Sequence, residues 1–111
     1  MTKEEILEGN KLIAEFMGFT VGEFGFQEPG EEWQQPFKHL KYHSSWDWLM
    51  PVVEKIETLG YGVKIHGIQC SVNRLLEDET IVQYVCGDVS KKIELVHMVI
   101  VEFIQWYNLN K

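Results

Sequence analysis

Basic residues are scarce in this chain. Its 111 residues include ten lysines and arginines, with Arg74 the one arginine, against 17 aspartates and glutamates, and the formal net charge is -7. Proteins that bind DNA or RNA usually carry a surplus of basic side chains to neutralise phosphates. We therefore expect no direct binding to nucleic acid. Most of the negative charge falls in residues 1–32, where eight glutamates stand against two lysines.

Cysteine and long hydrophobic runs are also scarce. Cys70 and Cys86 stand neither in a CxxC pair nor beside a pair of histidines, which argues against a zinc site, and both are expected to be buried thiols in a reducing cytosol. The longest apolar stretch, 93–107, is interrupted by four polar residues and is too short to span a bilayer. Residues 1–10 are acidic and polar, unlike a secretory signal. We expect a cytoplasmic protein without membrane contact or cofactor.

The chain has enough apolar material for one core. Hydrophobic residues make up 45% of it and aromatic residues 13%, and no Gly/Ser-rich linker interrupts it. A chain of this length is close to the commonest size of a single domain. We therefore predict one domain over residues 1–111.

Three segments have the periodicity of amphipathic helices. These are residues 3–17, 46–59 and 91–107, the last with an apolar surface broad enough for a central position. Thr2, with Glu5 three residues later, is a capping box for the first helix.

The strand pattern predicts a small antiparallel sheet. Apolar and polar residues alternate along residues 62–73, and the alternation shifts by one residue at Gly67, which we interpret as a bulge or bend. Residues 80–86 are expected to pair with this segment as a hairpin. Residues 37–42 are a short extended candidate, and 20–36 are predicted to form a long surface loop. The predicted class is α+β, with three helices on a small antiparallel sheet in the order α-(β)-α-β-β-α.

Three segments carry a resemblance. Residues 43–56 contain the motif SWDWLMPVVEKI, residues 13–18 read IAEFMG, and residues 101–108 contain an EFIxWYN-type helix. In this order they resemble short proteins encoded by gut bacteria and tailed phages. The resemblance implies a small accessory protein of a phage, prophage or bacterial host, and it brings no known activity and no catalytic residues.

Aromatic and polar side chains crowd one part of the chain. Trp33, Tyr42, His43, Trp46 and Asp47 are the candidate binding residues, because exposed tryptophan beside tyrosine and histidine is typical of binding hot spots. The alternative is structural: the aromatic rings anchor the loop, and the Asp47 carboxylate accepts N–H groups at the start of a helix.

A metal site is a weaker hypothesis. His39, His43 and Asp47 are spaced by four, which would align them on one continuous helix, but our segmentation divides them between a strand and a helix entrance. No metal-binding residue is assigned.

Catalytic residues are not assigned either. Cys70 and His97 would make a nucleophile and a base, yet no third orienting group is apparent in the sequence. We interpret His66 and His97 as core histidines.

The leading hypothesis for function is a small accessory protein that acts by protein–protein interaction or self-association, through the aromatic region or the exposed edge of the sheet. One alternative is a small-molecule-binding protein or minor enzyme with a pocket lined by Trp, Tyr, His and Asp. A second alternative is an acidic mimic of nucleic acid that acts in counter-defence.

Overall fold

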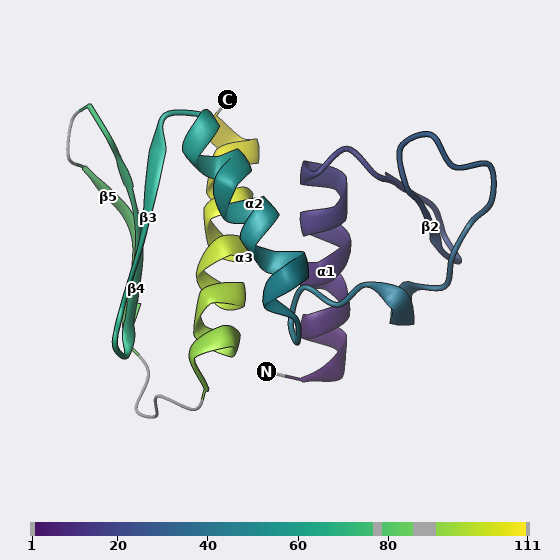
Figure 1. Cartoon of the computed structure of the whole chain (residues 1–111), viewed down its shortest axis with the longest axis horizontal. Coiled ribbons are helices and arrows are strands. Elements are labelled where there is room, and N and C mark those ends of the chain that lie inside the picture. Colours follow the sequence, from purple (N-terminus) through teal and green to yellow (C-terminus); the bar gives the residue numbers. More distant parts are fainter. Residues whose placement is uncertain (1, 77–78, 86–90, 111) are drawn as a thin grey trace.

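Three helices and two small antiparallel sheets make up the computed structural model, which describes residues 2–76, 79–85 and 91–110 (Figure 1). The predicted α+β class, with three helices and a small antiparallel sheet, is confirmed. The elements in chain order are α1 (Lys3–Phe16), β1 (Thr20–Val21), β2 (Phe26–Gln27), the 3-10 helix η1 (Phe37–His39), α2 (Trp46–Thr58), β3 (Tyr61–His66), β4 (Gln69–Arg74), β5 (Thr80–Val85) and α3 (Lys92–Asn110).

Helix α1 begins and ends where its sequence predicts. The hydroxyl of Thr2 accepts a hydrogen bond from the Glu5 N–H at 3.1 Å, which satisfies one of the free donors of the first turn. At the other end Gly18 has a φ of 92°, a left-handed conformation that costs glycine little, and the Phe19 N–H returns to the Ala14 carbonyl.

The larger sheet has one strand more than we predicted. Residues 62–73 do not form one bent strand, because the chain reverses completely at Gly67, where φ is 57°, and β3 and β4 pair as a hairpin. Strand β5 then pairs with β4, which gives the order β3-β4-β5. The one-residue shift in the alternation at Gly67 therefore reflects a real change in the backbone, which is a turn rather than a bulge.

The segment before α2 also differs from the prediction. Residues 37–39 form the 3-10 helix η1 instead of a strand, and a second hairpin, β1 with β2, lies within the predicted loop 20–36. The ring of Phe26 is fully buried and stacks on Phe19 with centroids 5.8 Å apart, which anchors this hairpin to the rest of the molecule.

Helix α3 occupies the centre of the fold. Figure 1 shows it between the sheet of β3, β4 and β5 on one side and α1 on the other, with α2 crossing beside it. Seven of its residues are buried: Leu95, Val96, His97, Val99, Ile100, Phe103 and Ile104. The broad apolar surface predicted for this helix is therefore confirmed, and its side chains join one hydrophobic cluster with those of the other elements.

Two serines precede helices, where a serine hydroxyl can cap the first turn. Ser45 stands at the N-cap of α2, but its side chain makes no capping hydrogen bond. Ser90, which precedes α3, and Cys86, which was predicted to be buried, lie outside the described residues.

A glycine sets the distance between α1 and α3. A Cβ atom on Gly9 would lie 2.9 Å from Val101 Cγ2 and 3.2 Å from His97 Cε1, closer than carbon atoms normally pack. Alanine usually stabilises a helix interior by about 1 kcal/mol relative to glycine. We expect Gly9→Ala to do the opposite and lower the free energy of unfolding by about 1–2 kcal/mol, because the two helices must move apart.

Urea unfolding of Gly9→Ala and of wild type measures this difference. Glu15→Ala, at an exposed position of the same helix, is the control and should change the free energy of unfolding by less than about 0.5 kcal/mol. A Gly9→Ala protein as stable as wild type would contradict the close approach of the two helices.

Candidate functional site

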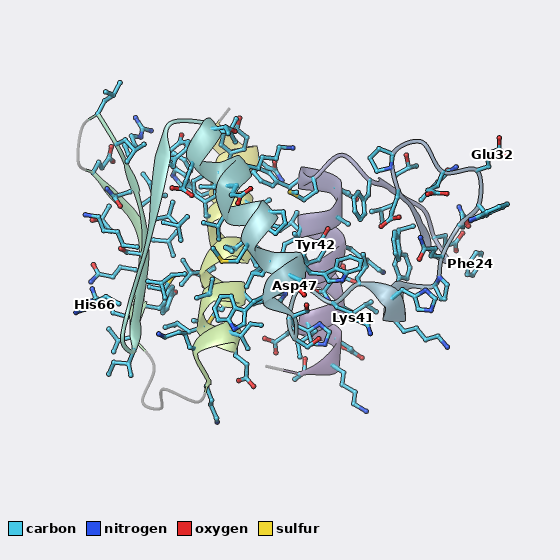
Figure 2. The ribbon with its side chains drawn as sticks, in the orientation of Figure 1. Phe24, Glu32, Lys41, Tyr42, Asp47 and His66 are labelled. Atoms are coloured by element: carbon cyan, nitrogen blue, oxygen red, sulfur yellow. The ribbon has the colours of Figure 1, made fainter. Side chains whose placement is uncertain are left out.

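The structure divides the five predicted binding residues. Trp33 is 69% exposed and lies in the segment after β2, far from α2; Figure 2 shows its neighbour Glu32 at the outer end of the molecule, while Tyr42 and Asp47 lie together at the start of α2. Trp46 is the first residue of α2 and is partly exposed. The predicted residues therefore do not form one continuous surface.

Tyr42 and Asp47 share a shallow hollow of about 270 Å³, which Met17, Phe19, Glu28, Trp48 and Pro51 also line. Tyr42 is almost fully buried and meets Trp48 edge to face, with centroids 5.2 Å apart. Burial, followed by the negative charge of Glu28, raises the pKa of the Tyr42 phenol, so this side chain stays neutral. Its contacts favour the structural interpretation, in which Tyr42 anchors the chain entering α2.

His43 belongs to a buried hydrogen-bond network that sequence reasoning missed. Its Nδ1 lies 2.9 Å from Asn10 Nδ2, and Asn10 Oδ1 lies 2.9 Å from His97 Nε2. The Asn10 amide also donates to the Leu40 carbonyl oxygen at 3.3 Å. Three segments far apart in the sequence, namely α1, the turn before α2, and α3, are therefore joined by one side-chain amide.

The partners of Asn10 fix the hydrogen positions of the network. A carbonyl oxygen only accepts, so the NH₂ group of Asn10 must face Leu40, and Oδ1 must face His97. His97 therefore donates through Nε2–H, and its Nδ1 carries a lone pair. The same amide group donates to His43 Nδ1, which therefore acts as the acceptor of this hydrogen bond.

His97 is a buried base without a partner for its second nitrogen. The residue has no exposed surface, and Nδ1 makes no hydrogen bond in the described structure. Burial, with a smaller contribution from the nearby His43, lowers the pKa of His97 to about 4. A cavity of about 100 Å³ is lined by His97, His43, Ile6 and Glu94, with no serine, threonine or cysteine among these residues to act as a nucleophile.

The remaining residues that we considered for catalysis or metal binding lie on different elements of the fold. Cys70 is fully buried in β4, and burial raises the pKa of its thiol to about 11, which keeps it protonated and unreactive. His39 lies on η1 and bonds Gln35, and within the described residues no three histidine, cysteine or acidic side chains converge as a metal site. His97 is buried in the core as we interpreted it, although its Nδ1 makes no hydrogen bond, whereas the same interpretation of His66 is wrong because His66 is exposed.

A hollow with a volume of about 630 Å³ lies between α1 and α3. Its floor is formed by Gly9, Leu12, Met98 and Val101, and its rim carries Gln105 and four glutamates, namely Glu4, Glu5, Glu8 and Glu102. We call this feature the acidic groove. The glutamates of α1 were visible in the sequence but indicated only a solvated face, because their partner surface on α3 comes from residues about 90 positions later.

Comparison with other proteins gives no family for this chain: no family model, curated protein or solved structure matches it. The helices that the structure describes include none with the length and apolar character needed to cross a membrane.

Proposed function

We propose that this chain is a small accessory protein that acts by binding another protein, and that the acidic groove receives a basic amphipathic helix of that partner. The observation that carries this proposal is the combination of an apolar floor with a rim of four glutamates in one hollow of about 630 Å³. A partner with apolar side chains on one face and lysines or arginines at the edges of that face complements both features.

The dimensions of the acidic groove fit a short helical segment. The groove as a whole runs along α1 from Glu5 to Leu12 and along α3 from Met98 to Gln105, a length of about 10 Å at 1.5 Å per residue. About two turns of a partner helix fit this length, enough for two or three apolar anchors at helical spacing. Met98, a flexible side chain on the floor, adapts to anchors of different shape.

The charges of the rim are available for recognition. Glu8 pairs with Lys11 at 3.4 Å, but its side chain is 73% exposed, so this pair contributes little and is readily exchanged. Glu4 and Glu5 are exposed, and Glu102 accepts a hydrogen bond from the Tyr84 hydroxyl at 3.0 Å. Cationic side chains of a partner would therefore find carboxylates on both helices.

We also place this action in the cytoplasm of a bacterium or a phage-infected bacterial cell. The resemblance of residues 43–56 and 101–108 to proteins of gut bacteria and tailed phages supports this context. The protonated, buried thiol of Cys70 is suited to a reducing compartment.

Binding is tested with a synthetic helical peptide of leucine and lysine, about 14 residues long, with leucine on one face. We expect Glu4→Lys with Glu8→Lys to weaken its binding at least about tenfold, because four units of charge change at the rim. Titration calorimetry measures the affinity, and chemical-shift changes in labelled protein locate the peptide.

The matched control is Glu54→Lys with Glu57→Lys, which changes the charge equally on the exposed side of α2. This pair should leave the affinity within about twofold of wild type at moderate salt. Equal losses from both pairs, or shifts that avoid Leu12, Met98 and Val101, would refute the acidic groove as the binding site.

A further inference from the structure

Strand β5 is an edge strand without the usual protection. Among the described strands β4 pairs with one side of β5 and none pairs with the other. Exposed edges are normally protected by lysine, proline or a covering element, because unpaired N–H and C=O groups invite another strand. The six residues of β5 include no proline and no charged residue, and four of them are β-branched.

The opposite edge of the same sheet is protected. Strand β3 carries Lys64 within the strand, and α2 packs beside it. The bulge in the pairing of β4 with β5 is at Ile81, which lies between the paired residues Thr80 and Val82. Residues 82–85 therefore form a regular and uncharged edge, with Val85 61% exposed and Tyr84 39% exposed.

The distribution of charge favours approach of a second copy at this sheet. Two copies of a protein with a formal net charge of -7 repel each other over most of their surfaces. Strands β3, β4 and β5 contain no aspartate or glutamate, while Lys64 and Arg74 lie on β3 and β4. The strands of this sheet thus contribute no carboxylate to a contact between two copies, and Glu102 of α3, which lies at the β5 edge, is held by the hydroxyl of Tyr84.

We propose that β5 pairs with β5 of a second copy, antiparallel about a twofold axis, so that two three-stranded sheets become one continuous sheet. Gln83 is placed on the axis beside its own counterpart, which sets Val82 opposite Tyr84 and Val85 beside Ile81, the residue at the bulge. Such β-branched and aromatic cross-strand pairs stabilise antiparallel sheets. Glu79, just before β5, is then at opposite ends of the interface in the two copies, where the acidic side chains do not face each other.

This proposal is independent of the acidic groove, which α1 and α3 form. An interface of one short strand per copy is small, so the dimer is expected to be weak and reversible. Sedimentation equilibrium of the full chain from about 1 to about 300 µM should show the average mass rising from that of a monomer toward that of a dimer. Hydrogen exchange at the two ends of this range should show protection at alternate amides of β5 that increases with concentration.

Gln83→Lys is the test variant, because it places two lysines directly opposite each other on the axis. We expect this variant to remain monomeric over the whole range, with an unchanged circular dichroism spectrum. Gln69→Lys is the matched control: it makes the same substitution on the same face of the sheet, one strand inward, and should dimerise like wild type. A strictly monomeric wild type, or a dimer that persists in Gln83→Lys, would overturn the proposal.

Discussion

Replacing Asn10 with alanine is expected to lower the free energy of unfolding by about 3 kcal/mol. The side-chain amide of Asn10 contacts Leu40, His43 and His97 within 3.3 Å, and both Asn10 and His97 are buried. The substitution leaves the Leu40 carbonyl and the His97 Nε2–H without partners, and each unsatisfied buried group costs about 1–3 kcal/mol. Chemical denaturation of the variant and of wild type at neutral pH measures the loss.

Two further variants separate hydrogen bonding from packing. Asn10→Asp keeps the shape of the side chain but replaces the donor NH₂ group with an oxygen that faces the Leu40 carbonyl, so we expect a loss at least as large. Asn108→Ala, at an exposed position of α3, should change the free energy of unfolding by less than about 0.5 kcal/mol. An Asn10→Ala protein that unfolds at the wild-type denaturant concentration would contradict the network.

Helices were the part of the fold that local sequence patterns predicted well. The Thr2 cap and the spacing of apolar residues in α1 are properties of neighbouring residues, and the structure confirms both. Strand pairing depends on contacts between distant residues. The parity change at Gly67 was compatible with a bulge or with a turn, and only the pairing of β3 with β4 distinguishes them.

Whether a histidine in a strand is buried depends on which face of the sheet its side chain occupies. His66 follows Lys64 by two residues on β3, so both side chains lie on the open face of the sheet, as Figure 2 shows for His66 at the outer side. Val63 and Ile65 occupy the face that packs against α3. Our prediction of a buried His66 failed because it did not assign the faces of this strand.

Local sequence patterns could not predict the buried hydrogen-bond network around Asn10. Asn10 and His97 are 87 residues apart, and in its own segment Asn10 is simply a polar residue within an amphipathic helix. Its burial follows from the close approach of α1 and α3 at Gly9, which no sequence periodicity reports. The acidic groove has the same origin, because its floor needs side chains from both helices.

Lowering the pH from 7 to 5 is expected to reduce the free energy of unfolding by about 2 kcal/mol through His97 alone. The folded state holds the pKa of His97 at about 4, whereas the ordinary value is 6.5, so below pH 6.5 the unfolded chain binds a proton that the folded chain does not. Each pH unit between these values costs about 1.4 kcal/mol, and the loss approaches about 3 kcal/mol at pH 4. Above about pH 7.5 His97 contributes almost no pH dependence, because its imidazole is then neutral in both states.

In the pH window from 7 to 5 ordinary carboxyl groups contribute little to the slope, because they titrate mainly below it. Denaturation curves at half-unit intervals should give a steep slope for wild type and an unchanged slope for His66→Gln, which removes an exposed histidine. His97→Gln should flatten the slope, since its amide can still donate to Asn10 Oδ1 but does not titrate. A wild-type stability that stays constant from pH 7 to pH 5 would show that His97 accepts a proton in the folded protein as readily as in the unfolded chain, and the buried network would then not hold this imidazole neutral.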